Sequence, residues 1–180
     1  MSGSRQGGFS AIELMITVAI AAILLTVAVP SFRDALARTR VSGTADELQS
    51  ALALARAEAL KLKLPVTLCA RASDTACATG TSWANGFLLF QDPNGNGVPE
   101  STELMLRART FNLPDITVRS DTASVSMLGN GRIAGGVART FEILGPDCTI
   151  GTGSGPEVGK RRQLTIAASG RASGRRLACG

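Results

Sequence analysis

The stretch that decides the fold is GFSAIELMITVAIAAILLTVAVP, residues 8–30, near the start of a 180-residue chain. Between Leu14 and Val29 only two threonines interrupt a run of Leu, Met, Ile, Val and Ala. Extended back to Phe9, the run is 21 residues long. A helix of that length reaches across the ~30 Å apolar layer of a bilayer at about 1.5 Å per residue. We therefore expect residues 9–29 to form a membrane-spanning helix.

A cleaved secretory signal peptide is the alternative interpretation of this segment. Arg5 would be its charged region, and residues 35–37 (ALA) would be its cleavage site. Two features disfavour it. Glu13 lies inside the apolar stretch, where a carboxylate needs a cation. The run is also followed by a polar but strongly helix-favouring segment from Phe32 to Leu64, which a signal peptide does not need.

Residues 7–20, GGFSAIELMITVAI, resemble the class III leader junction of type IV prepilins and type II secretion pseudopilins. The resemblance implies that a prepilin peptidase removes residues 1–8 by cutting after Gly8 and then methylates the new N-terminal residue, Phe9. It also implies that Glu13 pairs with the Phe9 amino group of a neighbouring subunit during filament assembly. The physical chemistry agrees, because a carboxylate in lipid needs a cation and a newly exposed α-amino group supplies one.

The following segment, residues 30–64, is expected to be the amphipathic half of the same helix. One apolar stripe recurs at a spacing of three or four residues and predicts packing on a globular head: Leu48, Leu52, Ala55, Ala59 and Leu62. Pro30 is expected to kink or locally melt the helix, because it lacks an amide hydrogen. Residues 44–47 (TADE) fit a capping box that would restart a helix after Gly43, but an uninterrupted helix is favoured. Pro65 then ends it.

Residues 65–180 are expected to form a β-rich head. Short segments between turns predict seven strands: Val66–Cys69, Phe87–Gln91, Leu104–Arg109, Ile116–Arg119, Ser124–Leu128, Thr140–Leu144 and Leu164–Ala168. Strands that follow one dominant helix indicate an α+β fold with antiparallel sheets packed on that helix. Residues 146–159, rich in Gly, Ser and Thr, are predicted to form a mobile loop.

The four cysteines, Cys69, Cys77, Cys148 and Cys179, permit three disulfide pairings. Cys69 and Cys77 are eight residues apart, which favours a local disulfide between them. Cys148 would then join Cys179 and hold the last residues on the head. Free thiols or a metal site are the alternatives, but the chain has no CxxC pair, and an exported head lies in an oxidising periplasm.

The head carries a narrower resemblance. Residues 83–97, WANGFLLFQDPNGNG, followed by ELMLR at 103–107, resemble the W-x-x-G-F/W-x-x-F-x-D-x-N-x-N-G block of the GspH/FimT/FimU minor pilins. Residues 129–132, 141–143 and 164–171 resemble that family's later hairpin and terminal strand. The resemblance implies a subunit stored in the inner membrane with a periplasmic head and then displayed in a cell-surface pilus beside other major and minor pilins. There are two alternatives. One is a GspH-like pseudopilin of a type II secretion system; the other is a structural subunit for pilus biogenesis that lacks the DNA-binding role considered below.

The segment from Asp92 to Gly97, with Glu103, also fits the calcium-loop pattern D-x-[DN]-x-[DN]-G-x5-E. Its flanks are predicted strands, not the helices of an EF-hand, and Pro occupies its second and eighth positions. Because Asp, Asn and Gly are also the residues that tight turns require, a polar hairpin turn is favoured. We expect no metal and no cofactor.

Six of the 19 basic residues lie in the last 21 residues, where no acid occurs. They are Lys160, Arg161, Arg162, Arg171, Arg175 and Arg176. The formal net charge of the whole chain is +5, so the rest of the protein is nearly neutral. A solvated charged face is the plain interpretation of such a run.

DNA binding is the sharper interpretation of the basic tail. Gly and Ser separate Arg171, Arg175 and Arg176, and flexible turns would let their guanidinium groups approach phosphates closely. The stretch also resembles the C-terminal Gly-Arg-x-Arg element of FimT-type minor pilins, although its spacing is wider; that element is associated with DNA binding in natural transformation. No aromatic residue follows Phe141, so we expect phosphate contacts that are independent of sequence, with Lys160, Arg161 and Arg162 as outer contributors.

The absence of histidine excludes a large part of enzyme chemistry. A chain without histidine has no His-based catalytic triad, no imidazole metal ligand and no imidazole acid–base catalyst. No Ser–Lys or carboxylate pair has a spacing that suggests a catalytic site. We therefore expect a filament component that works by assembly and contact, and not an enzyme.

Overall fold

The structure is a computed structural model, and it describes residues 10–150 and 159–180. The chain divides into two compact units, Met1–Leu36 and Ala37–Gly180. One long helix, α1 (Ala11–Leu62), contributes residues to both. Every strand of the described chain belongs to the second unit.

In the first unit, α1 is an apolar helix whose surface is uncovered. Its most apolar window has a mean hydropathy of 2.6, and none of that window is buried. The hydroxyls of Thr17 and Thr26 donate to the carbonyls of Leu14 and Ile23 (2.8 and 2.6 Å), so neither leaves a polar group unsatisfied. The helix continues through Pro30, so of the two expected effects, a kink or local melting, the melting does not occur. By length and composition, the helix is able to cross a membrane.

In the second unit, α1 buries one stripe of small and apolar side chains. The stripe comprises Ala37, Val41, Thr44, Ala45, Leu48, Ala51, Leu52, Ala55 and Ala59. Its spacing of three and four residues confirms the predicted apolar face at Leu48, Leu52, Ala55 and Ala59, whereas Leu62 is only half-buried. The helix also passes Gly43 without a break. It ends just before Lys63, which adopts a left-handed conformation (φ 58°), and Pro65 follows.

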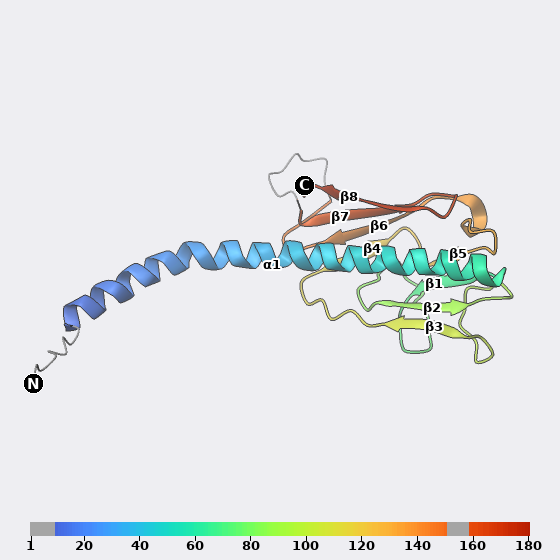
Figure 1. Ribbon diagram of the computed structural model, residues 1–180, viewed down its shortest axis with the longest axis horizontal. Coiled ribbons are helices and arrows are strands. Elements are labelled where there is room, and N and C mark those ends of the chain that lie inside the picture. The colour runs from blue at the N-terminus through green and yellow to red at the C-terminus, as the bar shows by residue number, and fades with distance from the viewer. Residues whose placement is uncertain (1–9, 151–158) are drawn as a thin grey trace, which may run out of the picture. The chain divides into compact units, whose positions relative to one another are not determined.

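Two four-stranded antiparallel sheets complete the second unit (Figure 1). The first has the order β3-β2-β1-β5 and the second has the order β4-β6-β7-β8. The strands of the first are β1 (Val66–Ala70), β2 (Phe87–Gln91), β3 (Met105–Arg109) and β5 (Ser124–Met127). Those of the second are β4 (Thr117–Ser120), β6 (Arg139–Leu144), β7 (Arg161–Ile166) and β8 (Ala172–Leu177). A short 3₁₀ helix, η1 (Ala134–Gly136), precedes β6. The predicted α+β class, with antiparallel sheets on a long helix, is confirmed.

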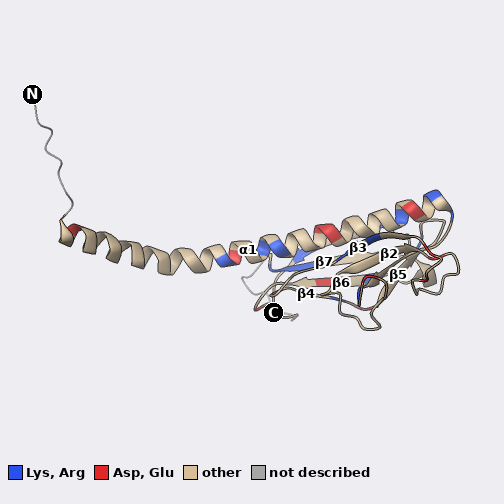
Figure 2. Ribbon diagram, turned by 90° about the horizontal axis from the view of Figure 1, so that it is seen from below, with Lys and Arg blue, Asp and Glu red and all other residues tan. Residues whose placement is uncertain are grey.

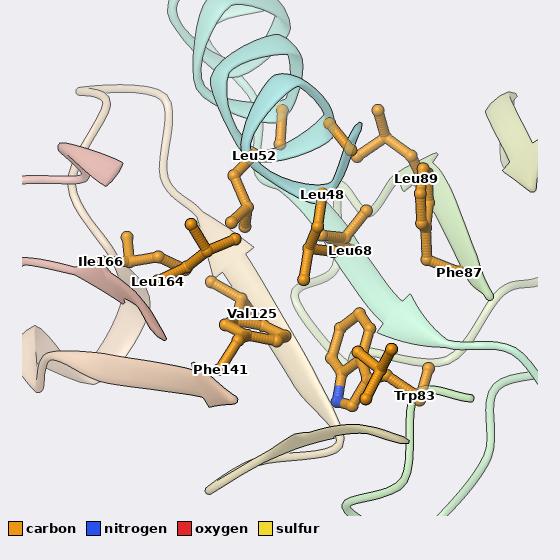
Figure 3. Close-up of a cluster of buried hydrophobic side chains, with 14 of the residues drawn as sticks. Leu48, Leu52, Leu68, Trp83, Phe87, Leu89, Val125, Phe141, Leu164 and Ile166 are labelled. Carbon is orange, nitrogen blue, oxygen red and sulfur yellow. The ribbon is translucent and has the colours of Figure 1, made fainter. Parts of the chain in front are cut away.

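The core lies where α1 meets both sheets. Figure 3 shows Leu48 and Leu52 of α1 pointing toward side chains of β1 and β7. The ring of Trp83 packs edge-on against Phe141 of β6, with the centroids 4.8 Å apart. Its indole N–H donates to the carbonyl of Thr122 (2.9 Å), which satisfies the polar atom of a fully buried side chain. The helix therefore forms one layer shared by two sheets, as its buried stripe requires.

Both disulfides join the cysteines that the sequence favours. Cys69 pairs with Cys77 across a local loop, and Cys148 pairs with Cys179. The second bond connects the segment after β6 to the residues that follow β8. It therefore holds the C-terminal end of β8 on the second sheet. The predicted loop at 146–159 lies largely outside the described residues.

Candidate functional site

The basic tail forms a strand and not a flexible turn. All six residues of β8 pair with β7, from Ala172 opposite Ile166 to Leu177 opposite Arg161. The hairpin between them closes with the Gly170 amide donating to the Ala167 carbonyl (2.8 Å). Gly170 has φ 78°, and a Cβ there would lie 2.0 Å from the carbonyl oxygen of Gly131. The turn therefore depends on this glycine, and β8 becomes the exposed edge of the second sheet.

Strand geometry sends neighbouring arginines of β8 to opposite faces. A Cβ on Gly174 would meet Leu164 at 2.8 Å and the Gln49 side chain of α1 at 3.2 Å, so the face of Gly174 is the one toward the helix. Arg176 shares that face, and Arg175 lies on the other. Both side chains are exposed. The sequence places these two charges side by side, but the fold places them on the two sides of one sheet edge.

On the face away from α1, Arg175 belongs to a hydrogen-bonded row that crosses three strands. Its Nε donates to Oε1 of Gln163 (2.7 Å), and Gln163 Nε2 donates to Oε1 of Glu142 (2.5 Å). Arg161 also donates twice to Glu142, from Nε to Oε2 (3.0 Å) and from Nη2 to Oε1 (3.2 Å). The Glu142 carboxylate thus binds one arginine directly and orients a second one through Gln163.

Three of the six residues predicted to contact DNA are buried or already paired with an acid within the fold. Lys160 and Arg161 are buried, and Arg161 is ion-paired with Glu142. The side chain of Arg162 is only 14% exposed, and its Nη2 lies 3.1 Å from Oδ1 of Asp46 on α1. Lys160 and Arg161 thus offer little exposed surface for the predicted outer contacts, whereas Arg162 keeps part of its side chain exposed in a recess beside α1.

The remaining arginine, Arg171, lies immediately before β8, five residues before Arg176. At about 3.3 Å per residue, roughly 16 Å of strand separates them. Arg171 borders a recess of about 310 Å³ that is also lined by Arg56 and Gln49 of α1. At the other end of β8, Arg176 borders a second recess together with Arg38 of α1. Figure 2 shows basic residues on α1 as well as on the strands beside it.

Sequence reasoning missed Arg38 and Arg56, which lie more than 100 residues before β8. The only signal that could have found them is their position at the margin of the buried stripe of α1. That signal becomes informative only once β8 is known to run beside this margin.

The Asp92 loop is organised by its own carboxylate. Asp92 is fully buried, and its Oδ2 accepts from the Thr67 hydroxyl (2.6 Å) and the Gly97 amide (3.0 Å). Its Oδ1 accepts from the Asn96 amide (3.0 Å). Within residues 10–150 and 159–180, no three His, Cys, Asp or Glu side chains are grouped as a metal site would need. These contacts are those of a polar turn after β2.

The N-terminal turn of α1 holds Glu13, the carboxylate predicted to act in assembly. Its amide donates to the Ser10 hydroxyl (3.3 Å), which caps the helix. The carboxylate lies in the first turn, where the helix dipole favours negative charge. It forms no ion pair with another described residue. The predicted cleavage and methylation residues, Gly8 and Phe9, lie outside the described residues.

Comparison with known proteins gives three findings. Residues 44–170, about 70% of the chain, match the family described as Type II transport protein GspH. The chain is 56% identical over 39 residues to the type IV major fimbrial protein FimA of Dichelobacter nodosus; this match covers 22% of the chain and only 24% of the length of that relative. The fold is similar to that of the type IV minor pilin FimU of Pseudomonas aeruginosa.

The match to FimU holds in two crystal forms. In one, the TM-score is 0.55 and the identity 21%, over 76% of this chain and 88% of FimU. In the other, the TM-score is 0.52 and the identity 22%, over 74% of this chain and 91% of FimU. At this identity the match is evidence for the fold.

Proposed function

The chain belongs to the GspH family, and on that premise we propose that it is a minor type IV pilin located at or near the tip of a pilus. Its family and fold are those of structural pilin subunits. The observation that carries the proposal is the division of α1 into an uncovered apolar part and a part that buries one stripe under two sheets. Such a helix serves first as a membrane anchor and then as the packing element of a filament.

Assembly follows from this division of the helix. Residues 1–8 are the leader, and cleavage after Gly8 exposes the Phe9 amino group. Residues 9–29 are stored in the inner membrane, and residues 30–64 connect them to the periplasmic head at 65–180. Glu13 then pairs with the Phe9 amine of a neighbouring pilin, because a carboxylate in an apolar environment requires a cation.

The finer part of the proposal is that the edge of β8 binds the backbone of duplex DNA, independently of sequence, during DNA uptake in natural transformation. Arg175 and Arg176 are exposed on the edge strand β8, and Arg171 is exposed immediately before it. The guanidinium groups of Arg171 and Arg176 make no ion pair or hydrogen bond with the residues that the structure describes, whereas Gln163 orients the side chain of Arg175. Guanidinium groups at both ends of a strand suit contacts to phosphates spaced along a duplex.

A salt series on the full chain in detergent tests the DNA proposal. The triple variant Arg171→Ala, Arg175→Ala, Arg176→Ala should bind duplex DNA more weakly. Its slope of log affinity against log salt should be shallower by about 0.9 for each phosphate contact that is lost. A charge-matched control, Lys61→Ala, Arg119→Ala, Arg132→Ala, removes three exposed cations from other elements. An equal loss of DNA affinity in both triple variants would mean that only net charge matters, and it would contradict a binding site on β8.

The second candidate function is that of a minor pseudopilin in a type II secretion system. It is favoured by the description of the matched family as a type II transport protein. Deleting the gene separates the two functions. A minor pilin predicts fewer or no surface pili with normal protein secretion, and a pseudopilin predicts the reverse.

A further inference from the structure

A recess lies between α1 and the ends of β7 and β8, within the second unit. Its volume is about 560 Å³, within the ~300–1,000 Å³ typical of ligand pockets. The polar and charged side chains of its lining come from α1 and from two neighbouring strands: Arg38, Thr39, Ser42, Asp46, Arg162 and Arg176. The recess therefore brings three guanidinium groups together with two hydroxyls and one carboxylate.

Two arginines of this recess come from neighbouring strands and lie close to each other. Arg162 and Arg176 are direct partners in the β7–β8 register, and both side chains face α1. Like charges directly opposite each other destabilise a sheet. Among the described residues of the lining, Asp46 has the only carboxylate; this group makes a single contact, with Nη2 of Arg162 (3.1 Å), and is itself 64% exposed. This one exposed carboxylate faces a cross-strand pair of arginines, Arg162 and Arg176, and Arg176 makes no ion pair with the residues that the structure describes.

Arg162 also holds an unused donor. Its side chain is 14% exposed, and its Nε is buried without a hydrogen-bond acceptor among the described residues. An unsatisfied buried donor on a charged group costs free energy that an incoming acceptor would recover. The site is therefore organised for an anion that brings several acceptor oxygens.

We propose that this recess binds a phosphate group. Guanidinium groups bind phosphate oxygens two at a time, and a tetrahedral oxyanion presents enough oxygens to meet arginines arriving from α1, β7 and β8. A carboxylate offers only two oxygens in one plane. The phosphate comes either from free inorganic phosphate or from the backbone of DNA. The site itself does not depend on the proposed DNA function, because free phosphate is sufficient to occupy it.

Thermal unfolding of the full chain in detergent tests the site, with inorganic phosphate compared with chloride at equal ionic strength. At a tenfold excess over its dissociation constant, phosphate should raise the Tm of the wild type by about 3 °C beyond chloride. Phosphate also stabilises proteins in general by exclusion from their surface, so the comparison between variants decides. Arg176→Gln and Arg38→Gln should each remove the specific rise.

The matched control is Arg175→Gln, which removes the same charge from the adjacent residue but on the opposite face of β8. It should retain the full phosphate effect. A rise equal in all four proteins, or absent in the wild type, overturns the site. Arg38→Gln lies on α1 and breaks no strand pairing, so it keeps the test decisive even if Arg176→Gln folds poorly.

Duplex DNA in the same buffer distinguishes the two sources of phosphate. If the pocket holds a backbone phosphate, Arg38→Gln should weaken DNA binding about tenfold relative to Arg119→Gln on β4, and free phosphate should compete with DNA. If phosphate stabilises the wild type but DNA does not bind, the pocket stands as a small-anion site and the DNA function fails. If DNA binds but phosphate has no specific effect, the DNA function survives and the pocket is disproved.

Discussion

Glu142 on β6 binds Arg161 on β7 at two points, with Nε–Oε2 and Nη2–Oε1 distances of 3.0 and 3.2 Å. Both side chains are close to nine-tenths buried. The same carboxylate accepts a hydrogen bond from Gln163, whose Oε1 accepts from Arg175. One buried acid therefore compensates a cation within the sheet and sets the orientation of another at its edge.

Replacing this acid should destabilise the head. Glu142→Gln leaves Arg161 as a buried cation without a counter-charge, which costs about 3 kcal/mol in buried pairs. Urea unfolding followed by circular dichroism measures the change. The control Glu58→Gln disrupts the more exposed pair with Lys61 and should cost under about 1 kcal/mol. Equal costs for the two substitutions would mean that the Arg161 pair contributes no more than a surface pair.

The β7–β8 hairpin should depend on Gly170 more than on any residue of β8. Gly170→Ala meets both an unfavourable φ of 78° and a carbonyl oxygen 2.0 Å from the new Cβ. We expect a loss of more than about 2 kcal/mol in unfolding free energy and faster amide exchange along β8.

Substitutions at two other glycines distinguish the cost of the positive φ from the cost of the steric clash. Gly135→Ala has a similar φ (75°) but no atom within 4 Å, so it should show only the conformational cost, about 1 kcal/mol. Gly80→Ala has neither problem and should be nearly neutral. If Gly170→Ala were no worse than Gly135→Ala, the close approach to Gly131 would carry no energetic weight.

The two disulfides should differ in their stabilising effect. Cys148–Cys179 spans 31 residues and Cys69–Cys77 spans eight. The chain-entropy estimate is about 3.7 kcal/mol for the longer loop and about 2.5 kcal/mol for the shorter one. Paired Cys→Ala variants, compared by urea unfolding, measure both values. Removing the longer link should also speed amide exchange in β8, and unchanged exchange there would contradict its role in holding this strand.

Processing of the leader provides a test in cells. Gly8→Val should leave a precursor that retains residues 1–8, because the peptidase resemblance places the cut after Gly8. Mass spectrometry of the membrane fraction distinguishes the precursor from a chain that starts at Phe9. Gly7→Val is the neighbouring control and should mature. Normal maturation of the Gly8→Val protein would refute the assigned cleavage site.

The helix and most strands could be predicted because their patterns are local. The 3–4 spacing of Leu48, Leu52, Ala55 and Ala59 defines a buried face without reference to any other element. β8 was missed because Ser173, Gly174 and two arginines have weak strand preference. Pairing with β7 and the disulfide at Cys179 outweigh that preference.

From the sequence, only the clustering of basic residues in the candidate site could be predicted, not their arrangement in space. A run of cations in the sequence does not reveal which face of a strand each residue occupies, and Arg175 and Arg176 lie on different faces. It also does not reveal which cations are already paired, as Arg161 is with Glu142. Arg38 belongs to the site because α1 packs beside the second sheet. No local pattern in the sequence predicts that contact.

The exposed edge of β8 also affects how heads behave when they are crowded together. An edge strand presents unpaired amides and carbonyls that can recruit a strand from another molecule, and proteins commonly block such edges with charge. Arg175 and Arg176 place a cation on each face of this edge, so a second copy of the same edge would meet like charges from both sides. In a filament, where heads are packed at high local concentration, this repulsion opposes edge-to-edge aggregation and keeps each head a separate folded body.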